Sequence, residues 1–90
     1  MKNVELANQI ITAINHPVRE KIVELLERHE LNVTEIQKKI NIEQAMTSHH
    51  LGVLKNAKLL KSKRNGKCVY YTTNDGMVLA LRSFLGEIAW

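Results

Sequence analysis

The hydrophobic spacing of this chain is helical almost throughout, and only residues 60–73 alternate between apolar and polar positions with period two. At the centre of that stretch stands Asn65-Gly66, a dipeptide typical of a two-residue β-hairpin, because a type I′ turn needs positive φ at both positions. This turn would set Arg64 opposite Lys67 across the hairpin. A single hairpin among helices restricts the chain to a mainly α fold with one small sheet.

Helical spacing and capping signals divide the rest of the chain into five helices. We predict them at about residues 4–14, 17–28, 34–40 and 43–57, and from Asn74 or Asp75 toward the C-terminus. His16 stands at an N-cap position, and Pro17 follows at the first helical position, which tolerates proline. Thr34 and Gln37 predict a capping box for the third helix. The third and fourth helices, joined by a short turn, fit a helix-turn-helix.

Length and composition predict a single domain over residues 1–90. A chain this short buries only roughly 60–65% of the surface that its unfolded form exposes, so its core is thin. The single cysteine excludes an internal disulfide and suits a reducing compartment. No apolar run approaches the ~18 residues of a membrane span. We therefore expect a cytoplasmic protein without membrane attachment.

Positive charge is concentrated in the middle third of the chain. Residues 41–73 carry six positive side chains against one negative, Glu43. Residues 1–40 carry six of each sign, and residues 74–90 carry one positive and two negative. The formal net charge of +4 therefore belongs to the segment that contains the fourth helix and the hairpin. A cationic element between neutral ones indicates a surface for a polyanion, which we take to be double-stranded DNA.

The fourth helix presents two different surfaces when its residues are placed at about 100° intervals. The predicted packing stripe holds Met46, His50, Val53, Leu54 and Ala57, with Leu51 at its margin. The opposite side holds Gln44, Ala45, Ser48, His49, Gly52 and Lys55. Glutamine can pair with adenine, serine and histidine can hydrogen-bond to bases, and an alanine methyl can touch thymine. An ordinary solvated face would carry more Glu and Lys, so we favour base recognition.

The tip of the hairpin is doubly charged, with no acidic residue to offset it. A lysine-protected sheet edge is the simpler interpretation. The tip also suits a phosphate backbone or a narrow minor groove, and we favour this function. The complete set predicted to contact DNA is Gln44, Ala45, Thr47, Ser48, His49, Lys55, Arg64, Asn65 and Lys67.

The sequence gives little support for metal binding, redox sensing or catalysis. His49 and His50 point about 100° apart on one helix, so they cannot chelate one ion, and we expect neither metal nor cofactor. Cys68 would lie opposite Lys63, which favours a thiolate. A resolving thiol would have to come from another chain, so we expect an ordinary half-buried cysteine rather than a redox sensor. No acidic pair or phosphate-binding glycine loop is present, which argues against an enzyme.

Three segments resemble the ArsR/SmtB family of winged helix-turn-helix repressors. They are His16–Ile22, Gln44–Leu60 with its Ser-His-His-Leu run, and Arg64–Tyr71, and the resemblance extends over about residues 7–88. It implies four helices, a two-stranded hairpin wing and a C-terminal helix. It also implies a homodimeric regulator that binds an imperfect palindrome and represses transcription, with base contacts at Gln44, Ala45, Ser48 and His49.

The resemblance further implies that the first and last helices form the dimer interface. Their apolar residues exceed what a small core needs, although the simpler interpretation is that they fill the monomer core. The residues predicted for the interface are Ala7, Ile10, Ile11, Ile14, Leu81, Phe84, Leu85 and Ile88.

The chain departs from the family at its metal sites. Asn32 and Thr34 stand where the family has cysteines, and Met77 follows Asp75 with no histidine beyond His50. The sequence leaves three kinds of inducing signal open, which are oxidation, an unknown small molecule and another protein. The alternative function is a protein-interaction module that binds a partner through the apolar terminal helices. RNA binding is disfavoured, because Tyr70 is the only good candidate for stacking on a base.

Overall fold

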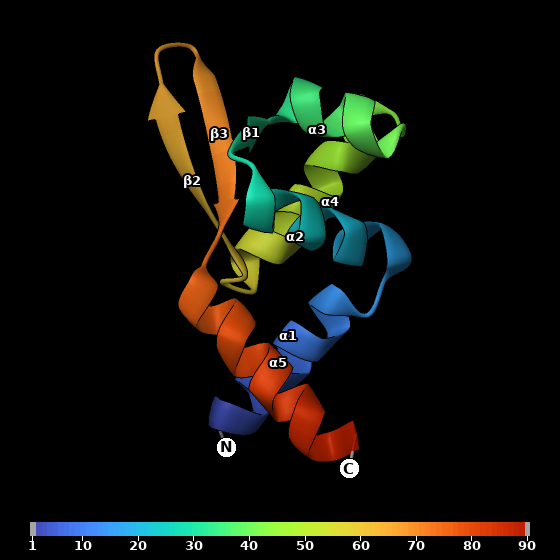
Figure 1. The fold of residues 1–90 in the computed structure, drawn as a ribbon, viewed down its shortest axis with the longest axis vertical. Helices are drawn as coiled ribbons and strands as arrows, with labels where there is room; N and C mark the ends of the chain where they lie inside the picture. Colours follow the sequence, from blue (N-terminus) through green and yellow to red (C-terminus); the bar gives the residue numbers. More distant parts are fainter. Residues whose placement is uncertain (1, 90) are drawn as a thin grey trace.

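The computed structural model describes residues 2–89, which form five helices and a three-stranded antiparallel sheet (Figure 1). The helices are α1 (Lys2–Ile14), α2 (Pro17–Arg28), α3 (Val33–Ile40), α4 (Gln44–Asn56) and α5 (Asp75–Ala89), and the strands are β1 (Leu31–Asn32), β2 (Leu60–Asn65) and β3 (Cys68–Thr73). The strand order is β1-β3-β2. The mainly α fold with one hairpin predicted from spacing is confirmed, as is the winged helix-turn-helix that the family resemblance implies, with β1 as an addition.

Helix α3 begins one residue earlier than predicted, because a different pair of side chains caps it. The side chain of Asn32 accepts from the N–H of Glu35 at 2.9 Å, and the side chain of Glu35 accepts from the N–H of Asn32 at 3.0 Å. The capping box at Thr34 and Gln37 is therefore wrong by two residues. The helix ends at Ile40, and its C-cap Asn41 has a φ of 63°, in the left-handed region that asparagine tolerates.

The wing turns one residue later than predicted. Asn65 pairs with Cys68, so Gly66 and Lys67 form the two-residue turn, and the predicted pairing of Arg64 with Lys67 is wrong. Gly66 has a φ of +65°, whereas Lys67 has no positive φ. A positive φ at the first central position alone is the type II′ pattern, which requires glycine there. The new register differs by two residues, so each side chain keeps its predicted face.

The core lies where α2, α3 and α4 meet the base of the wing. Its largest fully buried side chains are Ile22, Ile36, Leu51, Leu54, Leu59 and Thr47. Helices α1 and α5 lie next to each other at the end of the 40 Å long axis away from the tip of the wing (Figure 1). Within residues 2–89, the structure contains no helix with the length and apolar character needed to span a membrane.

Candidate nucleic-acid interface

The outward side of α4 is lined with small and polar side chains. The six residues predicted for it, Gln44, Ala45, Ser48, His49, Gly52 and Lys55, are all exposed. Apart from its chain neighbours and the backbone of its own helix, a Cβ placed on Gly52 would meet no atom within 4 Å, so the middle of this face is open to a close partner. The arrangement leaves a helix surface with one basic side chain near its C-terminal end and hydrogen-bonding groups near its start.

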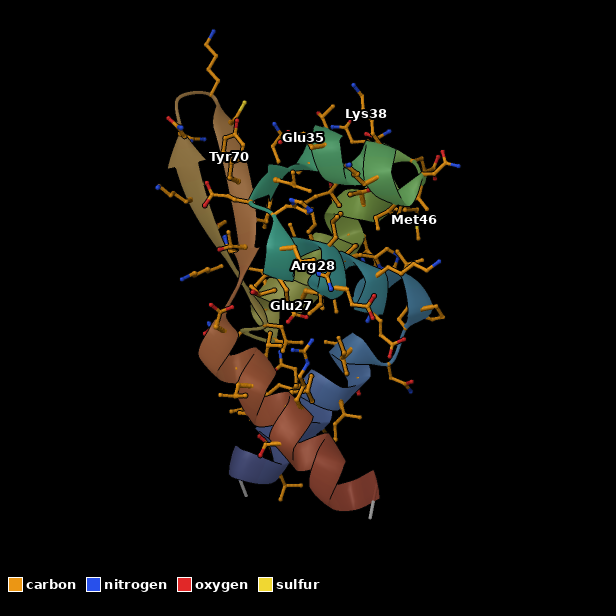
Figure 2. All side chains as sticks on the ribbon, viewed as in Figure 1. Glu27, Arg28, Glu35, Lys38, Met46 and Tyr70 are labelled. Atoms are coloured by element: carbon orange, nitrogen blue, oxygen red, sulfur yellow. The ribbon has the colours of Figure 1, made fainter. Side chains whose placement is uncertain are left out.

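The buried side of α4 is rotated by roughly 50° about the helix axis from the predicted packing stripe, at about 100° per residue. Thr47, predicted to contact DNA, is 0% exposed, and its hydroxyl donates to the carbonyl of Glu43 at 3.0 Å. Met46, predicted in the core, is 43% exposed and lies at the outer edge of the molecule (Figure 2). A threonine whose hydroxyl donates a hydrogen bond to a backbone carbonyl in the preceding turn can be buried without leaving that hydroxyl unpaired. The DNA-contact prediction for Thr47 is therefore wrong.

His50 is the polar centre of the packing side of α4. It is 3% exposed, and its Nδ1 accepts a hydrogen bond from Nε of Arg19 at 3.1 Å. The same guanidinium donates through Nη1 to the backbone carbonyls of Thr12 and Ala13, at 3.4 and 3.3 Å. Arg19 of α2 therefore joins the C-terminal turn of α1 to the middle of α4. The prediction that His50 belongs to the packing side is confirmed.

Two further histidines surround His50. His16 caps α2, where its Nδ1 accepts from the N–H of Val18 at 3.2 Å, as its position before Pro17 predicted. The ring of His16 lies 4.7 Å from that of His50, and the ring of His49 lies 5.6 Å away. Burial lowers the pKa of His50 below its ordinary value, and His16, the cation of Arg19 and His49 lower it further. The buried imidazole is therefore held in its neutral form.

The wing carries its positive charge at an exposed tip. Arg64, Asn65 and Lys67 are all exposed, as a contact with a phosphate backbone requires. Cys68 is exposed and lies opposite Asn65, so its predicted half-burial and its pairing with Lys63 are both wrong. The cause is the later turn, which moves each partner along the strand.

Two residues in this region were missed from the sequence: Arg19, which contacts the buried His50, and Met46, which is exposed on α4. Arg19 is 31 positions from His50, and helical spacing carries no information on a contact between two helices. Met46 stands three residues before His49, and this spacing places the two side chains as neighbours on one helix face. That spacing was the available signal, but an apolar residue was assigned to the core by default.

The opposite end of the molecule has an apolar surface. An open groove of about 270 Å³ runs between α1 and α5, lined by Leu6, Ala7, Ile10, Ile11, Met77, Ala80 and Leu81. Val4 and Leu79 add exposed aliphatic side chains, and Leu79 is 69% exposed. The structure thus leaves unpacked apolar surface on the two terminal helices.

The predicted interface residues divide between this groove and the core. Ala7, Ile10 and Ile11 line the groove. Leu81 lines it too, although it is only 8% exposed, and Ile10 and Ile14 pack against the core. The side chains of Phe84, Leu85 and Ile88, also predicted for the interface, lie outside the described part of the structure.

Comparison with known proteins identifies the family. Residues 16–62 match the family described as "Bacterial regulatory protein, arsR family". The transcriptional repressor SdpR of Bacillus subtilis is 36% identical over 67 residues, which cover 74% of each chain. The crystal structure of NolR from Sinorhizobium fredii superimposes with a TM-score of 0.82 at 26% identity, over 97% of this chain and 87% of that one.

The fold is also shared with the homodimeric winged helix-turn-helix DNA-binding domain Mb0332 from Mycobacterium bovis. It superimposes with a TM-score of 0.84 at 23% identity, over 98% of this chain and 82% of that one. Family and fold agree with the cationic wing and the open face of α4. The chain therefore belongs to the arsR family of bacterial regulatory proteins and is a DNA-binding transcriptional regulator of the winged helix-turn-helix type, not an enzyme.

Proposed function

We propose that this protein is a homodimeric repressor that occupies an imperfect palindrome in double-stranded DNA in the cytoplasm. The observation that carries the proposal is the exposed side of α4, which offers small and polar groups, together with the exposed cations at the tip of the wing. In a helix-turn-helix, the N-terminal part of the second helix enters the major groove and reaches the base edges. Here that part is the first two turns of α4.

The side chains divide into two roles in this proposal. Gln44, Ser48 and His49 supply sequence preference through hydrogen bonds to bases, and Ala45 allows close approach. Met46 adds an apolar group that suits a thymine methyl. Phosphate contacts that supply affinity come from the exposed cations Lys55, Arg64 and Lys67, with Asn65 at the turn.

The apolar end of the molecule supports a dimer. The groove between α1 and α5 and the exposed side chain of Leu79 on α5 offer surface that a second copy can bury. A protein of the same fold, Mb0332, is described as homodimeric. Two-fold symmetry would place the two copies of α4 one helical turn of DNA apart, roughly 34–36 Å.

We further propose that the inducing signal is not a metal at the positions to which the family resemblance pointed. Asn32 uses its side chain to cap α3, where it holds the N–H of Glu35 at 2.9 Å. Met77 packs against the core and offers a thioether in place of an imidazole. Both side chains therefore have structural roles in this chain.

Selection of bound fragments from a random duplex pool tests the proposal directly. We expect one enriched motif with two-fold symmetry. Anisotropy titrations of that duplex against salt should then give a steep linear fall of log affinity, because each neutralised phosphate releases counterions. Lys67→Ala should flatten the slope on every sequence. No enrichment together with a shallow slope would favour the protein-interaction module.

A further inference from the structure

The contacts of Arg19 join three helices through one rigid group. Its guanidinium binds Nδ1 of His50 on α4 and the carbonyls of Thr12 and Ala13 on α1. Helix α1 belongs to the end of the molecule proposed for dimerisation, and α4 carries the face proposed for DNA. Arg19 itself belongs neither to the proposed DNA contacts nor to the proposed dimer interface. A guanidinium fork is planar and fixed in shape, so it holds its partners at set distances from each other.

The contact between Arg19 and His50 exists in only one protonation state. Arginine has donors alone and stays protonated, so Nδ1 of His50 must be an acceptor without a proton. A neutral imidazole satisfies this by carrying its proton on Nε2. A charged imidazole has a proton on both nitrogens, which would set Nδ1–H against the Nε–H of Arg19. The link between α1 and α4 therefore requires neutral His50.

The surroundings of His50 offer no compensation for a positive charge. The groups that act on it are Arg19 from α2, His16 from the cap of α2 and His49 from α4, and all three disfavour its protonation. With 3% exposure, the ring has little access to water. A positively charged His50 ring must rotate or move out of this position, because a buried and unpaired charge is energetically costly.

We propose that Arg19 is a positioning residue that holds α4 against α1 through neutral His50, and that protonation of His50 in acid releases α4 and reduces preference for the operator. This inference rests on the proposed function, since the affected property is recognition of specific DNA. In the sequence, His50 comes directly after Ser48 and His49. A movement of its ring therefore displaces the side chains that are proposed to read the bases. Acid thus acts on the orientation of the reading helix rather than on its contacts.

The first test needs no DNA and no substitution. Long-range proton–nitrogen NMR of the unmodified protein near neutral pH should show His50 with its proton on Nε2 and none on Nδ1. The titration midpoint of His50 should rise in Arg19→Gln, because a nearby cation is lost. Lys21→Gln removes a charge from an exposed site on the same helix and should leave the midpoint unchanged. A proton on Nδ1 of the neutral ring overturns the proposal, as does an unshifted midpoint in Arg19→Gln.

The second test follows the ratio of affinities for operator and random duplex between about pH 8 and about pH 5.5. It uses a His49→Gln background, so that His50 is the only histidine on α4, and each ratio is compared with the value that this background itself gives near pH 8. We expect the ratio to fall about tenfold in acid, the factor that corresponds to loss of one hydrogen bond to a charged group. In Arg19→Gln the ratio should be low at every pH.

His50→Asn in the same background is the decisive variant. Its amide oxygen can accept from Arg19 and cannot be protonated in this range, so the ratio should stay constant with pH. A decline equal to that of the background overturns the proposal. If the unmodified protein selects no duplex near pH 8, the proposed function fails instead, while the NMR result still judges the contact itself.

Discussion

Gln44 lies in the first turn of α4, the part proposed to enter the major groove, and its exposed amide can reach a base edge there. We predict that Gln44→Ala costs about 1–3 kcal/mol of binding free energy on the operator and relaxes preference at one base pair. Binding to random DNA should hardly change, since the amide carries no charge. Anisotropy with a panel of single-base variants measures both effects. An equal loss on operator and random duplex would contradict direct reading of a base.

Thr47 lies on the packing face of α4 and not on the face proposed to read DNA, so a substitution there can test the two assignments. Because its side chain is buried, we predict that Thr47→Val leaves operator affinity unchanged. The free energy of unfolding should change by less than about 1 kcal/mol, because the carbonyl of Glu43 keeps the backbone N–H of residue 47 as a donor. Urea denaturation and anisotropy measure the two quantities. A loss of operator affinity with normal stability would restore Thr47 to the DNA contacts.

These residues also show how far side-chain type predicts position. The outward face of α4 could be predicted because small and polar residues at helical spacing rarely fill a core. The inward face was predicted with a rotation error, because Met46 was assumed buried and Thr47 assumed exposed. The hydrogen bond between Arg19 and His50 could not be predicted, since a contact between α2 and α4 depends on how the helices pack and not on the spacing of residues within one helix.

At the scale of elements, the start of α3 depends on one asparagine. We predict that Asn32→Ala lowers the free energy of unfolding by about 0.5–2 kcal/mol, because it removes the N-cap acceptor of α3. Thr34→Ala is the matched control, and it should cost less because Thr34 is exposed and takes no part in the observed capping box. Urea denaturation of both variants measures the difference. A larger cost for Thr34→Ala would support the box predicted from sequence.

Element types were predictable because each helix and the hairpin has a strong periodic signal. The bounds of α2 at Pro17 and Arg28 were predicted correctly, since a capping residue, a proline and a regular apolar stripe agree there. The wing turn was misplaced because Asn65-Gly66 and Gly66-Lys67 are both acceptable turns, and the strand pairing selects between them. Strand β1 has only two residues and pairs with β3, so no period could reveal it.

At the scale of the whole molecule, α1 and α5 form an end whose apolar surface the monomer leaves uncovered. The sequence predicted surplus apolar residues on these helices, and the positions predicted for the interface include both Ala7 and Ile11, which line the groove, and Leu81, which is largely buried. Leu79 was missed although it is the most exposed large aliphatic side chain among the described residues. A helix that packs on one side and dimerises on another has two apolar stripes, and spacing alone cannot assign them.

Leu79 provides the sharpest test of the dimer. Its exposure means that Leu79→Glu should change the free energy of unfolding of the monomer by no more than about 0.5 kcal/mol. If a second copy covers it, the change occurs twice across the two-fold axis, and the dimer should weaken by at least about tenfold. Sedimentation equilibrium measures the dissociation constant, with Thr34→Glu as a control that adds the same charge at an exposed site on α3.

Operator binding provides a second readout of the same variant. Leu79→Glu should lose affinity for the full palindrome. In a dimer, once one subunit has bound its half-site, the other subunit is held at a high effective concentration near the second half-site. Affinity for an isolated half-site should match that of the unmodified protein, since α4 and the wing are untouched. A dimer dissociation constant equal to that of the control would show that the face around Leu79 lies outside the interface. In that case the two copies of α4 would need another contact surface to reach successive major grooves.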